Sequence, residues 1–274
     1  MQNNQNNRVN VLGTMIDKLE ISEANNKISS LISGSSNKSH YVVKPYVEFL
    51  VKAQDDKKLQ QVLNDADLVL ADGTSVQWAA SYLYAEHRGK YFKLLASLLF
   101  WIQNDSWRNG IIPAKMAGAN QTFPLFKIAE QKGWKVGIIG GKDAVGRKKN
   151  ITKIFPKLAK LKVWGGYYDE SDEPNLVAEI KAAKLDILFV ATGFAKQELF
   201  IAKYIKQNLA SVLIGEGGTF DYKEFGGDIK RAPAWTQKIG LEWLWRLIIQ
   251  PSRITRQVAV PKFIYRVQKQ AKKL

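Results

Sequence analysis

The sequence of 274 residues has no cysteine and only two histidines, His40 and His87. The absence of cysteine excludes disulfides, thiolate nucleophiles and cysteine-ligated metal, and it fits a protein of a reducing compartment. Two histidines give no basis for a histidine-rich metal site. Neither a disulfide framework nor such a metal site is therefore expected.

Long apolar runs are also missing. No run reaches the roughly 18–20 apolar residues that a membrane-spanning helix needs. The longest candidate, Tyr91–Ile102, is shorter and contains Lys93. The first eight residues, MQNNQNNR, lack the apolar stretch of a signal peptide. We therefore expect neither a membrane span nor a secretion signal, and we expect residues 1–8 to form a disordered tip.

Acidic residues are few relative to basic ones, 25 against 41, which gives a formal net charge of +16. Such an excess predicts an anionic partner, which is a nucleic acid, an acidic membrane surface or a phosphorylated substrate. Residues 228–274 contain eleven lysines and arginines and only two acids. The nucleic-acid hypothesis rests on charge alone, because no motif that reads RNA or DNA is present. We expect no nucleic-acid partner.

Apolar runs and helical periodicities alternate along the chain up to about residue 220. This alternation predicts an α/β fold, with a layered, mainly parallel sheet flanked by helices. The expected strands are 9–12, 41–43, 68–70, 135–139, 162–165, 187–191 and 211–214. The expected helices are 22–33, 46–53, 55–64, 74–84, 121–132, 143–159, 174–184 and 196–208. Ligands of such sheets bind at the carboxyl ends of the strands, so the loops there are the candidate sites.

Asp72 stands at one of these joints, between the expected strand 68–70 and a helix that begins near Thr74. A carboxylate at this position has two interpretations. It can cap the helix, because aspartate is a good N-cap residue, or it can carry out proton transfer. One residue can do both.

Three further loops contain glycines or polar groups suited to a nucleotide sugar. The double glycine Gly140-Gly141 precedes a helix, where backbone and helix N-terminus can meet a phosphate, although a tight turn alone also explains it. Gln197 opens another helix and offers amide donors and a carbonyl to a base or sugar. The richest loop follows the strand 211–214. Its candidate residues are Gly217, Gly218, Asp221, Lys230 and Arg231, which suit a sugar diphosphate.

Two segments depart from the strand–helix alternation. Residues 85–112 interleave aromatic and basic residues and have the character of an insertion. Residues 240–267 set tryptophans and other apolar residues among five lysines and arginines. A basic amphipathic helix with tryptophan is typical of a membrane interface, while the alternative is a packed helix with a solvated basic face. The same two interpretations, a membrane contact or a helical hairpin on the core, apply to 85–112.

Several long motifs occur in an order that resembles a known family. They are RVNVLGTMIDKLEISEA, LADGTSVQWA, PAKMAGAN, TGFAKQELFI, GEGGTFDYKEFGGDIKRAP, and GLEWLWRL followed by PSRITR. Together they are similar to the WecG/TagA/CpsF glycosyltransferases (glycosyltransferase family 26) of bacterial envelope polymer synthesis, and they run through most of the chain.

The resemblance implies transfer of an N-acetylmannosamine-type or related sugar from a UDP donor to an undecaprenyl-diphosphate-linked sugar, with inversion and without metal or cofactor. It implies an α/β domain over 9–235 and a C-terminal appendage over 236–274 that docks on the anionic inner face of the plasma membrane, so that the protein is cytoplasmic and peripheral. Asp72 matches the catalytic base. The residues that match diphosphate or donor positions are Arg246, Arg253, Arg256, Gln197, Asp221 and the glycines Gly140, Gly141, Gly217 and Gly218.

The sequence departs from the family pattern at several positions. Lys44-Pro45-Tyr46 stands where the family usually has Thr-Pro-Asn, and Asn120 replaces an aspartate. Phe194-Ala195 and Glu216 are also unusual. Lys44, which takes the place of a suspected catalytic threonine, can contact donor phosphate, or it can pair with Asp72 and lower its basicity.

We assign Lys44 to the catalytic group, and Tyr46 and Asn120 to the acceptor or sugar pocket. A changed sugar specificity is the expected consequence. The alternative is a catalytically lapsed relative that serves as a membrane-binding or complex-binding module. The donor sugar, the acceptor glycan and the oligomeric state stay open.

Overall fold

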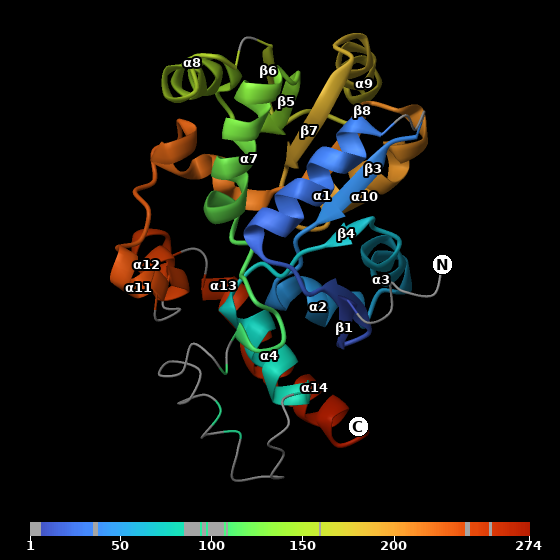
Figure 1. Ribbon diagram of the computed structural model, residues 1–274, viewed down its shortest axis with the longest axis vertical. Coiled ribbons are helices and arrows are strands. Elements are labelled where there is room, and N and C mark those ends of the chain that lie inside the picture. The colour runs from blue at the N-terminus through green and yellow to red at the C-terminus, as the bar shows by residue number, and fades with distance from the viewer. Residues whose placement is uncertain are drawn as a thin grey trace.

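A computed structural model describes residues 7–34, 38–84, 94, 97, 107, 109–158, 160–238, 242–251 and 254–274. Its centre is a six-stranded sheet in the order β4-β3-β8-β7-β5-β6, and all its pairs are parallel. The strands are β3 (His40–Val43), β4 (Leu68–Val69), β5 (Val136–Gly140), β6 (Leu161–Trp164), β7 (Leu185–Ala191) and β8 (Ala210–Gly215). The expected α/β fold with a mainly parallel sheet is confirmed (Figure 1).

Each central strand is apolar along nearly its whole length because both faces of the sheet are covered. In β7, Leu188 and Val190 belong to one core cluster, whereas Ile187 and Phe189 belong to a second cluster. Successive side chains of a strand point to opposite faces. The two clusters are therefore the two apolar layers on either side of the sheet.

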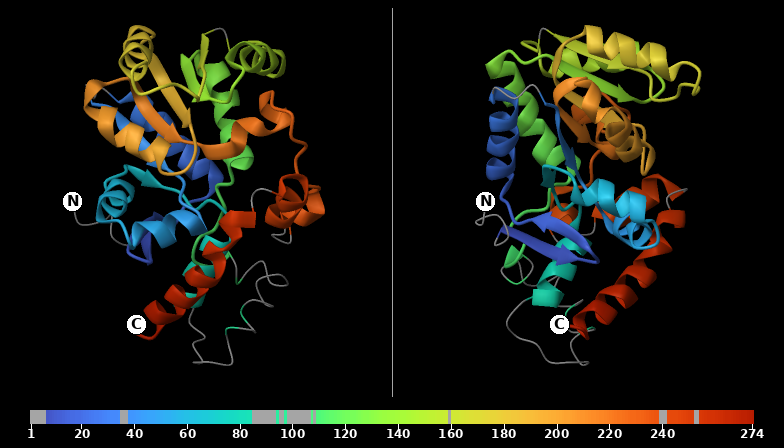
Figure 2. Two further views of the ribbon diagram at one scale, coloured as in Figure 1. Left: turned by 180° about the vertical axis from the view of Figure 1, so that it is seen from behind. Right: turned by 90° about the vertical axis from the view of Figure 1, so that its right-hand side faces the viewer.

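The helices divide between these two layers. The layer with Ile187 also contains apolar residues of α1 (Ile21–Ser33), α7 (Gly118–Lys132) and α8 (Ala144–Ile154). The opposite layer is built with α2 (Val47–Ala53), α3 (Lys57–Asn64), α4 (Thr74–Tyr84), α9 (Glu173–Ala182), α10 (Lys196–Tyr204) and the last helix, α14 (Ala259–Ala271). Figure 2 shows the sheet enclosed between them.

Two expected helices are shorter than the periodicity suggested. α8 ends at Ile154. Pro156 stands two residues later, and a helix rarely continues there because the residue before a proline disfavours the helical conformation. α10 ends at Tyr204 and passes into the single-turn helix η2 (Ile205–Gln207), after which Asn208 takes a left-handed conformation with φ +56°.

The expected strand 9–12 is confirmed to within one residue at each end, but the short antiparallel hairpin that it forms with a second strand was not predicted. β1 (Arg8–Val11) pairs with β2 (Thr14–Asp17) outside the main sheet. The turn uses Leu12 at φ +53° and Gly13 at φ +83°, and leucine is an unusual residue for a left-handed turn position. Arg8, which we placed in the disordered tip of residues 1–8, begins β1 and bonds Asp17 at 3.1 Å. Residues 1–6 of that tip lie outside the described residues.

The C-terminal residues are joined closely to the α/β layers. α14 contacts α2 and α4, and its Phe263 and Val267 are fully buried. The Gln270 side chain accepts a hydrogen bond from the Leu12 amide at 2.8 Å. The expected appendage of residues 236–274 thus ends in a helix whose apolar face packs on the core. This is the arrangement expected of a packed helix with a solvated basic face.

Three shorter helices precede α14. They are α11 (Ala234–Lys238), α12 (Glu242–Ile249) and α13 (Ile254–Gln257). Most of the expected insertion 85–112 lies outside the described residues, as does Arg253. Within the described ranges, no helix combines the length and the apolar character that crossing a bilayer requires.

Candidate active site

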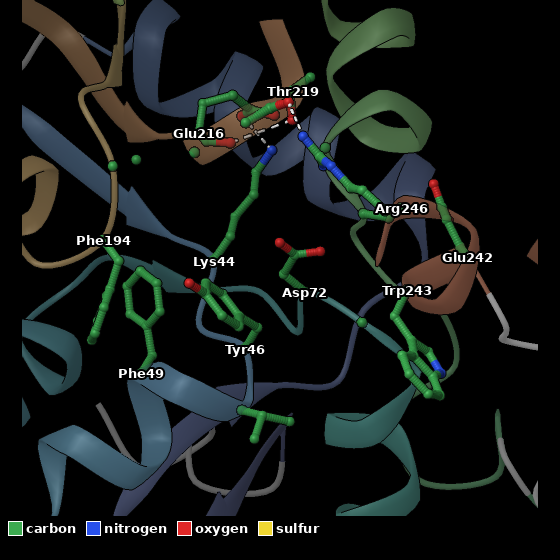
Figure 3. A pocket seen from close by; sticks show the side chains of 18 of the residues that line it. Lys44, Tyr46, Phe49, Asp72, Phe194, Glu216, Thr219, Glu242, Trp243 and Arg246 are labelled. Carbon is green, nitrogen blue, oxygen red and sulfur yellow. Dashed lines mark hydrogen bonds and ion pairs between the residues drawn. The ribbon is translucent and has the colours of Figure 1, made fainter. Parts of the chain in front are cut away.

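A pocket of about 580 Å³ opens at the carboxyl ends of the parallel strands. Residues that follow all six strands of the main sheet line it, among them Lys44 after β3, Asp72 after β4 and Glu216 after β8. Trp243 and Arg246 of α12 also line it (Figure 3), and so does Phe263 of α14. The sheet thus places its loops at the edge where the sequence predicted a site.

Asp72 lies half-buried in the wall of this pocket. Its amide donates to the Pro45 carbonyl at 3.1 Å, which ties the loop after β4 to the loop after β3. In the described part of the chain its carboxylate makes no hydrogen bond to an N–H of α4, so it does not act as a helix cap here. Gly73, at φ +104°, turns the chain sharply after Asp72 and is the kind of residue that this conformation favours.

The pKa of Asp72 is raised to about 7. Burial is the largest cause, since it disfavours the charged carboxylate. The charges that act on it are Lys44 and Arg246, which lower its pKa, and Glu216 and Glu242, which raise it. A carboxyl group with a pKa near 7 can exchange a proton with a substrate at neutral pH, so Asp72 has the property that a general base needs.

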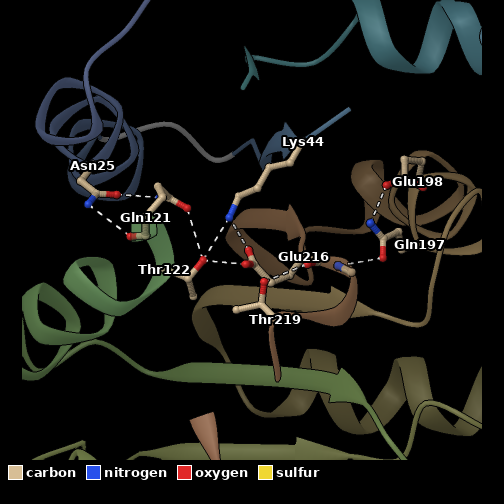
Figure 4. A network of polar contacts seen from close by, with 9 residues as sticks. Asn25, Lys44, Gln121, Thr122, Gln197, Glu198, Glu216 and Thr219 are labelled. Atoms are coloured by element: carbon tan, nitrogen blue, oxygen red, sulfur yellow. Dashed lines mark hydrogen bonds and ion pairs between the residues drawn. The ribbon is translucent and has the colours of Figure 1, made fainter. Parts of the chain in front are cut away.

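Lys44 does not pair with Asp72. Its ammonium donates to Glu216 Oε2 at 2.5 Å and to Thr122 Oγ1 at 3.0 Å. Thr122 in turn donates to Glu216 Oε1 at 2.7 Å (Figure 4). Lys44 and Glu216 are 4% and 5% exposed. Lys44 and Glu216, which the sequence marked as unusual and which directly follow the neighbouring strands β3 and β8, are therefore partners in one buried ion pair.

Gln197 connects a buried carboxyl group to the glycine loop that follows β8. Its amide nitrogen donates to Glu198 Oε1 at 2.7 Å, and its carbonyl accepts from the Gly217 amide at 3.1 Å. Glu198 is completely buried, and burial raises its pKa to about 8. These two hydrogen bonds hold the Gln197 side chain in one orientation at the pocket wall. Its carbonyl oxygen faces the glycine loop.

Arg246 is brought to the glycine loop from α12. Its guanidinium donates to the Gly218 carbonyl at 2.9 Å and lies 3.4 Å from Asp221 Oδ2. It also donates to the Tyr222 hydroxyl at 3.0 Å and stacks over that ring at 4.6 Å. A guanidinium fixed in this way presents its planar fork at the pocket.

The pocket brings together most of the residues that the sequence proposed. Those that line it are Asp72, Lys44, Tyr46, Gly141, Gln197, Gly217, Gly218, Asp221 and Arg246. Gly140, Asn120 and Arg231 do not line it, and Arg231 donates instead to the Asn120 side chain. Arg256 belongs to α13, but its side chain is outside the described residues, as all of Arg253 is.

Several pocket residues were not among the sequence candidates. Glu216 was noted only as a departure, and Thr122, which does not itself line the pocket, bonds it from behind. Lys115 and Trp243 line the pocket with Glu242, whose carboxylate is 3.8 Å from Lys115 Nζ. Lys115 lies within the motif PAKMAGAN, where nothing distinguished it from its neighbours, and Thr122 follows that motif in a segment without a signal of its own.

One wall of the pocket is aromatic. The ring centroids of Tyr46 and Phe49 are 4.9 Å apart, and those of Phe49 and Phe194 are 4.2 Å apart. Both Tyr46 and Phe194 are positions where the sequence departs from the family pattern. Among the residues that the structure describes, no three acidic or histidine side chains gather as a potential metal site. The pocket therefore combines an aromatic wall with a charged floor.

The chain is similar to known proteins over most of its length. Residues 9–112 and 106–274 match the glycosyl transferase WecG/TagA/CpsF family. The chain is 29% identical over 263 residues to the N-acetylglucosaminyldiphosphoundecaprenol N-acetyl-beta-D-mannosaminyltransferase of Bacillus subtilis (strain 168), covering 95% of this chain and 88% of the relative.

It is 28% identical to the protein of the same name from Bacillus spizizenii (strain ATCC 23059 / NRRL B-14472 / W23), over 85% of this chain and 80% of that relative. Since the family match extends through nearly the whole chain, this protein belongs to the glycosyl transferase WecG/TagA/CpsF family.

Proposed function

We propose that this protein transfers a hexose, of the N-acetylmannosamine type or a related kind, from a UDP donor to a sugar on undecaprenyl diphosphate. The names of the two Bacillus relatives supply the acceptor class and the type of sugar. The observation that carries the proposal is Asp72, a carboxyl group with a pKa of about 7 in a pocket that the glycine loop and Arg246 also line.

Asp72 acts as the general base. The acceptor hydroxyl attacks the anomeric carbon of the donor sugar, a C–O bond forms there, and the hydroxyl proton passes to the Asp72 carboxylate. The bond from the anomeric carbon to the UDP oxygen breaks on the opposite side, and the configuration is inverted. At pH 7 about half of the molecules hold Asp72 in its charged form, because its pKa is about 7.

The leaving UDP takes up negative charge, which donors in the pocket must balance. Arg246 is positioned to supply this charge, because its guanidinium contacts Gly218 and Asp221 in the glycine loop. The diphosphate displaces the 3.4 Å contact with Asp221 and bonds the planar fork in its place. Because arginine and backbone N–H groups supply this balance in the proposal, no metal and no cofactor has a part in it.

The acceptor is attached to a lipid, so the pocket must open near a membrane surface. Trp243 lines the pocket and is still 42% exposed. Further exposed apolar side chains follow it on α12 and α13 and just before α14, namely Leu244, Ile248, Ile249, Ile254 and Val258. We assign this apolar surface, together with the lysines and arginines of residues 236–274, to docking on an anionic bilayer. The protein is then peripheral on the cytoplasmic face.

The alternative of a catalytically lapsed relative was motivated by Lys44-Pro45-Tyr46 and Asn120. The Lys44 ammonium is bonded to Glu216 and Thr122, which leaves Asp72 without a cation bonded to it and speaks for a working base. Asn120 bonds Arg231 outside the pocket lining. Activity of the purified protein decides between the two hypotheses.

The test uses the full chain, a panel of UDP-hexoses and UDP-N-acetylhexosamines, and a short-chain polyprenyl-diphosphate-linked N-acetylglucosamine, all with EDTA present. We expect UDP to bind in calorimetry and one UDP-sugar to yield a lengthened lipid-linked product in mass spectrometry. The Asp72→Asn variant should bind UDP but give no product. If wild-type protein neither binds UDP nor forms any product, the proposal is wrong. If it binds UDP and lipid without transfer, the lapsed-relative hypothesis is correct.

A further inference from the structure

Two rings of the aromatic wall, Tyr46 and Phe194, are accessible from the pocket. Both line it, and each is partly exposed. Their ring centroids are 6.1 Å apart, and the ring planes meet at 62°. Phe49 is only 1% exposed and packs against both rings. The wall therefore offers a ligand the rings of Tyr46 and Phe194, and Phe49 supports them.

Both rings are held in place within the protein. The Tyr46 hydroxyl donates to Glu48 Oε2 at 2.8 Å, and Lys52 Nζ lies 5.2 Å from the ring centroid of Phe194. Ala195, which follows Phe194, has φ +63°. This conformation is strained for alanine, and such strain is concentrated at ligand sites. Side chains that are already ordered lose little entropy when they bind a ligand.

The two rings are close to Asp72, on the side away from the donors of the glycine loop. Tyr46 follows Pro45, whose carbonyl accepts from the Asp72 amide at 3.1 Å. In Figure 3, Tyr46 lies on one side of Asp72, and Thr219 and Arg246 lie on the other. An inverting displacement requires the acceptor to approach the anomeric carbon opposite the leaving diphosphate. With the diphosphate at Arg246, the acceptor sugar therefore comes to the side of Tyr46.

The strand order supports the same division of the pocket. β3 and β4, which precede Tyr46 and Asp72, are at one end of the sheet, and β5 and β6 are at the other. Gly141 after β5 and Gly166 after β6 also line the pocket. Their end of the pocket is left for the nucleotide, so the two rings are placed where a sugar, and not the base of UDP, is expected.

The side of the pocket with the two rings also leads toward the surface assigned to the bilayer. Val260 and Ile264 of α14 line the pocket, and they pack on the same core cluster as Tyr46. Val258, two residues before Val260, is 74% exposed and belongs to the surface assigned to membrane docking. A sugar bound at Tyr46 can therefore remain attached to a lipid in the membrane.

We propose that Tyr46 and Phe194 bind the acceptor sugar by stacking on the C–H face of its pyranose ring. This inference rests on the proposed function of the pocket. The C–H groups of a sugar carry partial positive charge, and the face of an aromatic ring is negative, so the two surfaces attract each other. Stacking also fixes the orientation of the sugar, and its attacking hydroxyl is thereby presented to Asp72.

The experiment measures KM for a short-chain polyprenyl-diphosphate-linked N-acetylglucosamine at saturating donor, and the Kd for UDP. The double variant Tyr46→Leu/Phe194→Leu keeps apolar side chains but removes both rings. Its KM for the acceptor should rise at least about 10-fold, since each ring contributes about 2- to 10-fold, while the Kd for UDP stays the same. Tyr46→Phe loses the hydroxyl and keeps the ring, so its KM should stay within about 2-fold of wild type.

The matched control is Phe123→Leu. Phe123 is also partly exposed, its ring centroid is 5.0 Å from that of Phe155, and Lys127 Nζ lies 5.1 Å from it. It does not line the pocket, so KM for the acceptor should not change. If the Tyr46/Phe194 double variant is folded by circular dichroism and has the KM of wild type, the two rings are only structural and the inference is wrong.

Two further results would assign the rings to another ligand and overturn the inference. The first is a rise in KM for a long-chain acceptor without a rise for the short-chain one, which would mean that the rings bind the lipid. The second is a Kd for UDP that rises as much as KM, which would mean that they bind the nucleotide. Absence of UDP binding and of product with wild-type protein overturns the proposed function and this inference together.

If the double variant does not fold, saturation-transfer NMR on wild-type protein replaces it. Saturation of the aromatic protons of the protein should reach the ring C–H protons of the bound acceptor sugar. A bound acceptor whose sugar protons receive no saturation overturns the inference, while the proposed function stands on the measured transfer.

Discussion

Lys44 Nζ lies 2.5 Å from Glu216 Oε2, and this contact decides the electrostatic state of the pocket floor. A lysine beside Asp72 would hold its carboxyl group in the charged form and reduce its basicity. With Glu216 as the partner, the positive charge is largely compensated, and burial remains the dominant influence on Asp72, whose pKa is about 7. An unusual lysine is thus compatible with a working base because an equally unusual glutamate accompanies it.

Replacing Asp72 by asparagine should lower kcat by about 10²- to 10⁴-fold, because this removes the group that accepts the proton. UDP affinity should change little, since the substitution keeps the shape of the side chain. In wild-type protein the charged form is the active one, so kcat should rise with pH to about 7 and then level off. Rates measured from pH 5 to 9 with a constant-ionic-strength buffer test this. A flat profile, or an asparagine variant as active as wild type, would contradict the role of Asp72.

Replacing Arg246 by lysine should lower kcat/KM by about 10²-fold, because a single ammonium cannot bond a diphosphate in the planar, two-point manner of arginine. Because lysine retains the positive charge, a lower kcat/KM would show that the two-point bonding geometry of the guanidinium matters. Arg266→Lys is a matched control. Arg266 also bonds a carboxylate, that of Asp55 at 2.7 Å and 2.9 Å, but from α14 outside the pocket. Equal effects of the two substitutions on kcat/KM would mean that Arg246 has no special part in binding diphosphate.

Glu198→Gln should stabilise the protein at high pH. Burial raises the pKa of Glu198 to about 8, from an ordinary value of 4.5. Between these two values the unfolded chain has released the proton while the folded protein still holds it. Stability therefore falls as pH rises toward about 8. The glutamine variant lacks this loss, and we expect a gain of about 2 kcal/mol at pH 9 and little difference near pH 5.

Urea unfolding at both pH values measures this difference, and Glu173→Gln is its control. Burial favours a higher pKa for Glu173, but hydrogen bonds from Lys203 and Tyr204 outweigh it, so that the pKa is lowered. Its charged form stabilises the fold at neutral and high pH, and this contribution is lost in acid. Glu173→Gln should therefore give no gain at pH 9. A Glu198→Gln variant without such a gain would show that Glu198 is charged in the folded state.

The apolar surface of α12, α13 and the start of α14 should control membrane binding. Ile248 and Val258 are 68% and 74% exposed, and changing either to glutamate places a negative charge where an anionic bilayer is proposed to bind. We expect co-sedimentation with vesicles containing phosphatidylglycerol to fall at least about 10-fold for the double substitution. Val145→Glu on α8 is the control, since Val145 is also exposed but does not belong to this surface. If wild-type protein, the Ile248/Val258 double variant and the Val145→Glu variant sediment equally, this surface does not bind the membrane.

A large part of the fold followed from local patterns. Each strand of the main sheet was expected within a few residues of its position, because buried parallel strands are short apolar runs bounded by turns. Strand β1 was expected at 9–12, but its pairing with β2 was missed, since Leu12-Gly13 lacks the residues that usually signal such a turn. The ends of α8 and α10 were placed too far along the chain, because periodicity continued beyond Pro156 in one case and into a tighter helix in the other.

The sequence by itself determined the α/β class, the edge of the sheet at which the pocket opens, and the polar residues in the loops there, among them Asp72, Gln197 and Gly217. These properties are local, because they depend on which residues follow each apolar run. Family motifs added roles for Asp72 and Arg246 that periodicity could not supply, and those roles stay predictions until the variants are measured.

Only the tertiary structure decided which of these residues meet. Lys44 and Glu216 are 172 positions apart, and they are neighbours because β3 lies next to β8 in a sheet whose strand order differs from the chain order. Arg246 reaches Gly218 because α12 returns to the carboxyl edge of the sheet. Strand order and helix docking arise from the packing of whole layers, so no local pattern could reveal that Lys44 already has the carboxylate of Glu216 as its partner.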